Sequence, residues 1–410
     1  METGGVEDAF SLALLAGPTS VVTAVEAAAL EIGASDVVLY MADLGQTELI
    51  PMPGGSGTDG PPPPEPVDAS VAGRAFTEQR PVEVDRPGGT RLFVPVVEGA
   101  DRTGVLAMTL PSGSGSTGDG ADRSVAPGDD PTAAGVRLGR LVGYLIATHA
   151  RTTDAFHHGR RIRHLSRAAS MQWSLLPPSV VEAPGVRLAA ALQPAYEVGG
   201  DSFDYAVNGQ VLDVALMDAM GHGMGSALIA ALTMGTYRHE RRHGGSLAEI
   251  HAALDEAVVE RYRGDGFSTG QLARLDLDTG SLSWTNAGHP MPLLIRNGRL
   301  VGELACAPTR PWGLGTTGPA AGTVPVATEM LQPGDRILFY TDGVVDARDP
   351  GDTEFGVDRL TEMAAQRATE QRSPEETVRR LVAAVVAHRG DDDLADDASL
   401  VLVEWDGPVP

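Results

Sequence analysis

Acidic side chains stand at the ends of apolar runs in the second half of this chain of 410 residues. At a strand end, a sheet can present a polar side chain without losing core packing. The carboxylates in such positions are Asp201, Asp218, Asp342 and the adjacent pair Asp396 and Asp397. Carboxylate oxygens are the ligands that Mg2+ and Mn2+ prefer, with no histidine or cysteine required. The pattern predicts an oxygen-rich site for such ions, which can activate a water and hold a phosphoryl group for in-line attack.

The turn between the first two of these aspartates sets their expected geometry. Asn208-Gly209 lies between apolar runs and is a strong hairpin signal. Taken as a two-residue turn, it places Asp218 opposite Gly199 and makes Asp201 a diagonal neighbour on the same face, about 7–8 Å away. Two carboxylates at that distance can hold a divalent cation between them. A pair of exposed aspartates at strand ends is the alternative that this segment alone leaves open.

The elements that must position these residues lie in a globular stretch over residues 179–406. Its expected strands come in consecutive pairs joined by short turns and do not alternate strictly with helices. Helical patterns cover residues 225–243, 246–262 and 373–389. This order predicts an α+β fold, with two antiparallel sheets forming a sandwich and helices outside it.

The first part of the chain shows a different organisation. Two Gly-, Ser- and Pro-rich stretches, residues 54–66 and 112–131, read as loops or tethers. Short strand and helix patterns around them predict a small mixed α/β domain within residues 9–131. Residues 132–178 carry a long helical pattern that Pro177-Pro178 ends, which indicates a helical linker suited to a dimer seam or lever.

Composition excludes several classes of function. The chain has 31 Lys and Arg against 55 Asp and Glu, a formal charge of −24, which disfavours nucleic acid and anionic membranes as partners. The single cysteine, Cys306, rules out an internal disulfide and a thiolate-rich metal site. With no membrane-spanning apolar run and no basic leader at the start, we expect a cytoplasmic protein.

Several motifs in order make the second part recognisable. SMQWSLLPP, VGGDSFDY, VALMDAMGHG, TNAGHP, LFYTDG and DDASLVLV resemble the bacterial sporulation stage II protein E type of metal-dependent serine/threonine phosphatase (PPM), over about residues 170–404. The resemblance implies an αββα sandwich with two Mn2+ or Mg2+ ions. It implies, as ligands, the side chains of Asp201, Asp218, Asp342 and Asp396 and the backbone carbonyl of Ala219, with Asp397 the less favoured of its pair. The first domain resembles a GAF sensor domain, and its lack of cysteine excludes a covalently attached tetrapyrrole.

These features predict hydrolysis of phosphoserine or phosphothreonine in proteins by a metal-activated water, with no further catalytic side chain. By resemblance, the expected partner is a phosphorylated anti-sigma-factor antagonist, and the expected assembly is a homodimer. The alternative is a non-catalytic pseudophosphatase that senses a ligand and binds the antagonist. Control is expected through the helix before the sandwich, whose apolar stripe must bury against a partner helix or the domain: Leu165, Met171, Leu175 and Leu176.

Other residue types receive structural interpretations first. His222 and His289 are expected to hold loop geometry by hydrogen bonding, with a direct role near phosphate as the alternative. Asp204 lies three residues after Asp201 and points to the opposite face of a regular strand. The alternative for Asp204 is that it supports the metal-ligating residues or binds a transient third metal ion. Packing roles are expected for Cys306, Trp284 and Trp312.

Overall fold

The computed structural model describes ten segments of the chain. They are residues 21–53, 62–111, 131–150, 153–156, 160, 164–193, 199–315, 323–369, 373–390 and 397–408. The chain divides into two compact units, residues 1–162 and residues 163–410. No helix of the described segments is long and apolar enough to cross a membrane.

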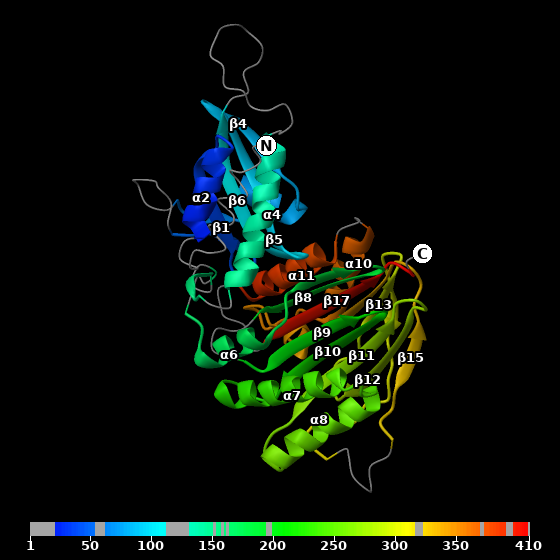
Figure 1. Cartoon of the computed structure of the whole chain (residues 1–410). Helices are drawn as coiled ribbons and strands as arrows, with labels where there is room; N and C mark the ends of the chain where they lie inside the picture. Colours follow the sequence, from blue (N-terminus) through cyan, green and yellow to red (C-terminus); the bar gives the residue numbers. More distant parts are fainter. Residues whose placement is uncertain are drawn as a thin grey trace, which may run out of the picture. The chain divides into compact units, whose positions relative to one another are not determined.

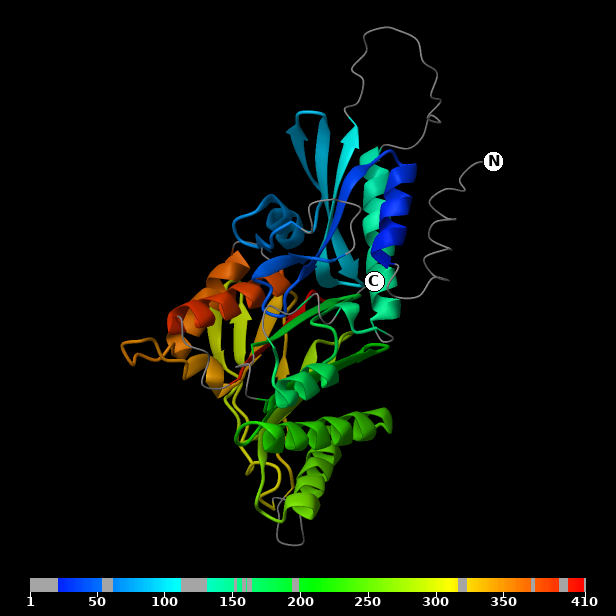
Figure 2. The same cartoon turned by 90° about the vertical axis from the view of Figure 1, so that its left-hand side faces the viewer.

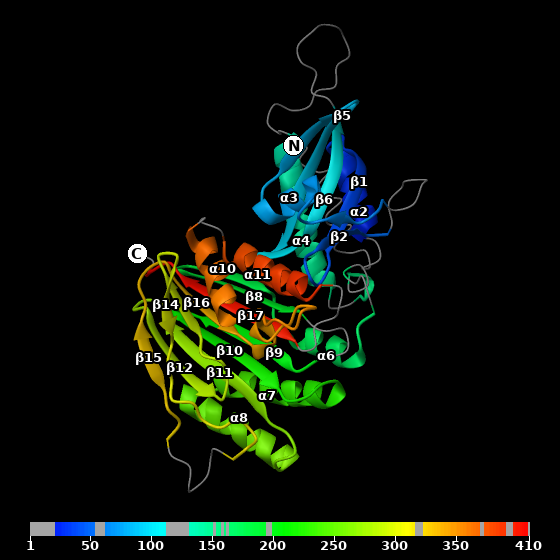
Figure 3. The same ribbon diagram turned by 180° about the vertical axis from the view of Figure 1, so that it is seen from behind.

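The first unit is built on a six-stranded antiparallel sheet in the order β3-β2-β1-β6-β5-β4. Its elements are α2 (Val21–Glu31), β1 (Ser35–Ala42), β2 (Glu48–Pro51), β3 (Glu65–Pro66), α3 (Val71–Glu78), β4 (Val82–Arg86), β5 (Gly89–Glu98), β6 (Asp101–Pro111) and α4 (Pro131–His149). Helices α2 and α4 share one apolar core with the sheet, and α3 shares another (Figures 1 and 3). The mixed α/β character predicted for this region is therefore present.

Helix α4 lies unusually close to β5 because glycines line its inner face. A Cβ added at Gly139 would come within 2.6 Å of a methyl of Val94, and one at Gly143 within 1.8 Å of the Val97 carbonyl oxygen. Next to these glycines, Leu138 and Val142 are buried in the core of the first unit. Helix α4 is therefore a core element of that unit.

The prediction of one long helical pattern through residues 132–178 is wrong in this respect. Helix α4 ends at His149, and α6 (Arg167–Leu175) starts separately and belongs to the second unit. Ser166 caps α6, since its side chain accepts a hydrogen bond from the backbone N–H of Ala169. The periodic pattern could not reveal this break, because both helices have apolar faces that bury against different cores.

The second unit contains the remaining elements. Its strands are β7 (Val180–Ala183), β8 (Val186–Gln193), β9 (Asp201–Asn208), β10 (Val211–Ala219), β11 (Ser268–Asp276), β12 (Ser281–Ala287), β13 (Leu293–Arg296), β14 (Arg299–Glu303), β15 (Ala327–Met330), β16 (Asp335–Tyr340) and β17 (Ala398–Trp405). After α6, its helices are α7 (Met224–Arg242), α8 (Leu247–Tyr262), α9 (Asp342–Val345), α10 (Val357–Thr369) and α11 (Pro374–Arg389). A capping box between Ser246 and Glu249 starts α8.

The predicted sandwich is confirmed in the second unit. One sheet has the order β15-β12-β11-β10-β9, the other β14-β13-β16-β17-β8-β7, and neighbouring strands pair antiparallel. Their facing apolar side chains, including Phe203, Trp284 and Trp405, form the central core. Helices α7 and α8 cover the outer face of the first sheet, and α10 and α11 cover that of the second (Figures 1 and 2).

The sequence placed the β9–β10 turn one residue too early. Asn208 pairs with Val211, so the turn residues are Gly209 and Gln210, and Gly209 has a φ of +59°. Glycine at the first central position with positive φ is typical of a type II′ turn, which matches the twist of the strands. The pairing therefore shifts by two positions, and the side chains keep their faces.

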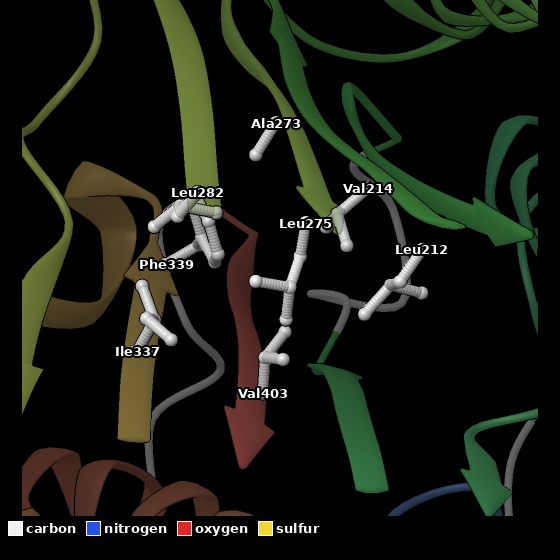
Figure 4. A pocket seen from close by; sticks show the side chains of 8 residues that line it. All are labelled: Leu212, Val214, Ala273, Leu275, Leu282, Ile337, Phe339 and Val403. Carbon is white, nitrogen blue, oxygen red and sulfur yellow. The ribbon is translucent and has the colours of Figure 1, made fainter. Parts of the chain in front are cut away.

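A small cavity lies between the two sheets and offers no polar group. Figure 4 shows its lining side chains, which come from β10, β11, β12, β16 and β17. They are Leu212, Val214, Ala273, Leu275, Leu282, Ile337, Phe339 and Val403. An apolar cavity of this kind does not suit a phosphorylated ligand. The candidate site must therefore be sought where the strands end.

Candidate metal centre

Two of the predicted ligands face each other across the β9–β10 ladder. Asp201 begins β9, Asp218 lies near the end of β10, and the corrected register makes them direct partners. The sequence had placed them as diagonal neighbours. Directly opposed side chains have Cβ atoms about 4.5–5.5 Å apart, closer than a diagonal pair. The structure therefore brings the two carboxylates nearer to each other than predicted.

Burial makes this arrangement electrostatically costly without a cation. Asp201 is 2% exposed, whereas Asp218 is partly exposed. Burial raises the pKa of Asp201 well above its usual range, and the nearby carboxylates of Asp218 and Asp397 raise it further. A divalent cation would relieve both effects, because it supplies positive charge in place of lost solvation.

A backbone oxygen lies beside the same strand end. The bare Cα of Gly200 lies close to Ala219: an added Cβ would come within 2.6 Å of the Ala219 carbonyl oxygen. The Ala219 N–H donates to the Gly200 carbonyl at 3.1 Å. Any larger residue at position 200 would thus displace the carbonyl that the resemblance assigns to a metal. Together with the facing carboxylates, this oxygen gives a donor set that fits Mg2+ or Mn2+.

Asp397 supports the backbone at the start of β9. Its Oδ2 accepts hydrogen bonds from the Gly200 N–H at 2.8 Å and the Asp201 N–H at 3.2 Å. The same oxygen accepts from Gln172 Nε2 at 2.8 Å. Burial raises the pKa of Asp397, and these three donors oppose that rise. The carboxylate therefore holds the strand end of Asp201 in place.

Gln172 connects α6 directly to this strand end. Its side chain is fully buried, and Nε2 also donates to the Asp201 carbonyl at 2.6 Å. The α6 residues that are buried are Ala168, Ala169 and Gln172, while the predicted stripe of larger apolar residues is half-buried. The sequence located the docking helix but not the face that it buries most deeply.

The third predicted ligand lies next to a residue that contacts Asp201. Asp342 is exposed at the first position of α9. The preceding Thr341 donates its hydroxyl to Asp201 Oδ2 at 2.8 Å and accepts the Ser399 backbone N–H at 2.9 Å. The strand end of β16 is therefore tied to the facing carboxylates through Thr341.

A second threonine contacts the other carboxylate. Thr269 pairs with Asp218 across the β10–β11 ladder, and its hydroxyl donates to Asp218 Oδ2 at 3.4 Å. Thr269 Oγ1 also lies 2.8 Å from Nδ1 of His289, which is 5% exposed. Burial lowers the pKa of His289 to about 4, with the Tyr340 carbonyl acting in the opposite direction, so the ring is neutral.

Other residues from the sequence fall outside this cluster. Asp204 is buried in ion pairs with Arg238 and Arg241, at 2.9 and 3.0 Å, on the side of α7. His222 is exposed in the loop before α7. Cys306 is buried, and burial raises the pKa of its thiol, which fits the predicted packing role.

The complete ligand set predicted from the sequence is not assembled in the described segments. Asp396 lies outside them. Within them, no three His, Cys, Asp or Glu side chains lie close enough to hold one metal ion. Asp342 and Asp396 therefore stay predicted ligands, while Asp201 and Asp218 form the pair that the structure brings together.

Sequence reasoning missed the residues that support the aspartates. Thr269 could have been recognised as the cross-strand partner of Asp218, but only once the register of β10 and β11 is known. Thr341 directly precedes an expected ligand, and a hydroxyl there is a natural donor to a neighbouring carboxylate. Gln172 is an amide within an apolar helix pattern, and its partners are 29 and 225 residues away in sequence. That separation hides the contact from local pattern reading.

Comparison with known proteins decides the family of this unit. Residues 208–406 match the model of the family Stage II sporulation protein E (SpoIIE). The second unit contains a SpoIIE-type phosphatase domain. The match includes Asp218, Ala219, Asp342 and Asp396, and the fold of this domain is the sandwich described above.

Individual relatives resemble the SpoIIE-type domain at moderate identity. Protein IcfG of Synechocystis sp. is 27% identical over 231 residues, 48% of this chain and 35% of that protein. Phosphoserine phosphatase RsbP of Bacillus subtilis is 25% identical over 189 residues, 45% of each chain. The chain thus spans less than half the length of these two curated relatives. The crystal structure of the RsbU and RsbW domains of Rv1364c from Mycobacterium tuberculosis is 27% identical, covering 57% of this chain and 63% of that one, with a TM-score of 0.48.

Proposed function

We propose that the SpoIIE-type domain of this chain is an active, metal-dependent phosphatase that hydrolyses phosphoserine or phosphothreonine in a protein. The observation that carries the proposal is the pair of facing carboxylates, Asp201 and Asp218, beside the Ala219 carbonyl. One member of the pair is buried, and burial together with the carboxylates of Asp218 and Asp397 raises its pKa. Burying one of two facing carboxylates destabilises the fold, so we infer that the pair serves to bind a cation.

The residues predicted from the sequence would hold the cofactor, two Mn2+ or Mg2+ ions. Asp201 and Asp218 would each contribute a carboxylate, and Ala219 would contribute its backbone carbonyl oxygen. Asp342 and Asp396 would provide the remaining carboxylates. When bound, such ions supply Lewis acidity and a water of lowered pKa. Thr341 and Thr269 orient the facing carboxylates, and Asp397 fixes the backbone of the strand that carries Asp201.

For the substrate, we propose a phosphorylated anti-sigma-factor antagonist protein. Support comes from the matched relative RsbP, which is named a phosphoserine phosphatase. The family match and the similarity to the RsbU and RsbW domains of Rv1364c point the same way. A protein substrate also suits a site at the edge of a sandwich, which a phosphorylated side chain can reach without entering the apolar core.

We further propose that residues 9–131 form a GAF-like sensor and that the chain acts as a homodimer in the cytoplasm. The support for the sensor is its six-stranded antiparallel sheet with helices on both faces. In this proposal, the predicted linker 132–178 contributes α4 to the sensor core and α6 to the phosphatase domain. Signals from the sensor would act on the segment between α4 and α6. Light scattering would measure the mass of the particle and so test the homodimer.

Control of activity is proposed to act through α6. Gln172 on this helix donates to the Asp201 carbonyl and to Asp397. Arg238 of α7 donates to the Leu175 carbonyl at the end of α6, at 2.7 Å. A ligand or partner that prefers one position of α6 would therefore change the support of the strand end that carries Asp201.

Hydrolysis of p-nitrophenyl phosphate by the full chain tests the catalytic proposal. The proposal expects turnover that requires Mn2+ or Mg2+ and stops when a chelator is added. The matched control is Asp204→Asn, an equal change on the same strand outside the carboxylate pair, which is expected to keep metal-dependent turnover while it stays folded. If neither Mn2+ nor Mg2+ supports turnover, the result would favour the non-catalytic alternative, a module that only binds the antagonist.

A further inference from the structure

Each of the two facing carboxylates receives a hydrogen bond from a threonine. Thr341 donates to Asp201 Oδ2, and Thr269 donates to Asp218 Oδ2. A hydroxyl has one proton, so it can donate to only one acceptor at a time. Its direction is fixed when a second group donates to its oxygen. For Thr341 that second group is the backbone N–H of Ser399.

For Thr269 the corresponding donor is the ring of His289. The Nδ1 atom lies 2.8 Å from Thr269 Oγ1, and the ring is neutral, so it carries one N–H. Among the described residues, His289 Nε2 has no hydrogen-bond partner of acceptable geometry, although the atom is buried. Of the two neutral forms of the ring, the one with its proton on Nδ1 lets His289 donate to Thr269, which directs the hydroxyl proton of Thr269 to Asp218.

The backbone around His289 holds the ring in place. The His289 N–H donates to Asn286 Oδ1 at 2.8 Å, and Asn286 Nδ2 donates back to the His289 carbonyl at 2.7 Å. Asn286 is 1% exposed at the end of β12, the strand next to β11. The chain of contacts from Asn286 through His289 and Thr269 to Asp218 therefore runs through rigid, buried elements.

We propose that Thr269 and His289 are positioning residues for metal binding. They hold one oxygen of Asp218 by a directed hydrogen bond and leave the other oxygen to a divalent cation. The inference rests on the proposed metal-dependent function and deepens it by naming residues that act on a ligand without being ligands. Outer groups of this kind commonly contribute 10- to 100-fold to metal affinity.

The test is calorimetric titration of Mn2+ into the full chain and its variants. Thr269→Val removes the hydroxyl with little change in shape, and we expect it to weaken Mn2+ binding about 10-fold or more. Thr269→Ser keeps the hydroxyl and is expected to bind within about 3-fold of the wild type. His289→Asn retains an amide N–H near the position of Nδ1 and should bind more tightly than His289→Ala.

A second threonine–histidine contact in the same sheet provides the matched control. Thr285 Oγ1 lies 3.2 Å from His251 Nδ1, and both residues are fully buried. In the part of the chain that the structure describes, neither residue hydrogen-bonds directly to Asp218, Thr269 or His289. His251 reaches that network through Thr309, which donates to the Asn286 carbonyl. Thr285→Val is therefore expected to lower the melting temperature of the metal-free protein without changing its Mn2+ affinity. Thr269→Val should differ by weakening Mn2+ binding, in addition to any fall in melting temperature from the lost contact with His289.

The outcomes separate this inference from the proposed function. Unchanged Mn2+ affinity in Thr269→Val, with a wild-type chain that binds Mn2+, overturns the positioning role alone. Equal losses in Thr269→Val and Thr285→Val overturn it as well, because they would reflect general destabilisation. A wild-type chain that binds neither Mn2+ nor Mg2+ overturns both the inference and the proposed function.

Discussion

Replacing Asp201 with asparagine should separate the metal role of this residue from its effect on stability. The amide is neutral and a weaker ligand than a carboxylate, so metal-dependent phosphatase activity should be lost. The same change removes the negative charge of Asp201, which is buried and faces the charge of Asp218. In the absence of metal, Asp201→Asn should therefore fold and be more stable than the wild type at neutral pH.

The size of the stabilisation follows from the geometry. Opposed side chains lie about 5 Å apart, and two unit charges at that distance repel by about 3 kcal/mol at an effective dielectric constant of about 20. Asp218 is partly exposed, so solvent screening lowers this value. We expect a gain of about 1–3 kcal/mol in the free energy of unfolding, or about 2–4 °C in melting temperature per kcal/mol.

The gain should depend on pH in a defined direction. The pKa of Asp201 is raised in the folded protein, so the folded state binds more protons than the unfolded state between the ordinary and the raised pKa. Metal-free wild-type stability is therefore retained below the ordinary carboxylate pKa of about 4 and falls as the pH rises through the raised pKa. Asp201→Asn lacks this group, so its advantage should grow over that range and vanish in acid.

Thermal unfolding in a chelating buffer, measured from pH 4 to pH 8, provides the assay. Asp204→Asn is the matched control, because Asp204 is equally buried on the same strand but paired with Arg238 and Arg241. Breaking a buried ion pair is destabilising by roughly 3–5 kcal/mol, so the control should move in the opposite direction. A loss of stability in Asp201→Asn at neutral pH, without metal, would refute the electrostatic reasoning.

Three further predictions concern the support of the site. Gln172→Ala should destabilise the protein by about 1–3 kcal/mol, measured by chemical unfolding, because it removes the donor to the Asp201 carbonyl and to Asp397. Gln172→Glu should be worse, since it adds a charge facing Asp397; equal stability of either variant would contradict this contact. Mn2+ affinity measured by calorimetry should fall as the pH falls through the raised pKa of Asp201, with protons released on binding; a pH-independent affinity would contradict it. Leu175 of α6 is half-buried and Ser174 is exposed, so Leu175→Glu should lower turnover of p-nitrophenyl phosphate more than Ser174→Glu. Equal rates in the two variants would contradict a role of α6 docking in the control of activity.

The fold of the second unit could be predicted because its strand pattern is local. Alternating apolar residues and short turns between consecutive strands indicated paired antiparallel strands, and the structure has this arrangement. The β9–β10 turn was misplaced by one residue because Asn208-Gly209 and Gly209-Gln210 are both turn-compatible dipeptides. The alternation of side chains kept Asp201 and Asp218 on one face despite this error, because a register change of two positions preserves the face.

Long-range contacts limited what the sequence could predict of the site. Strand ends drew attention to the aspartates, but nothing local distinguishes the ion pairing of Asp204 from a role near a metal. The salt bridges of Asp204 come from α7, more than 30 residues later in the chain. The break between α4 and α6 was also hidden, because both helices carry apolar faces, which bury against different cores.

The most direct test of the account is phosphate release from a phosphoserine protein or peptide by the full chain. The account predicts release that requires added Mn2+ or Mg2+, stops in the presence of a chelator and is lost in Asp218→Asn while that variant stays folded. Release that continues in Asp218→Asn, or that is unaffected by the chelator, would contradict the claim that the facing carboxylates hold the ions on which hydrolysis depends.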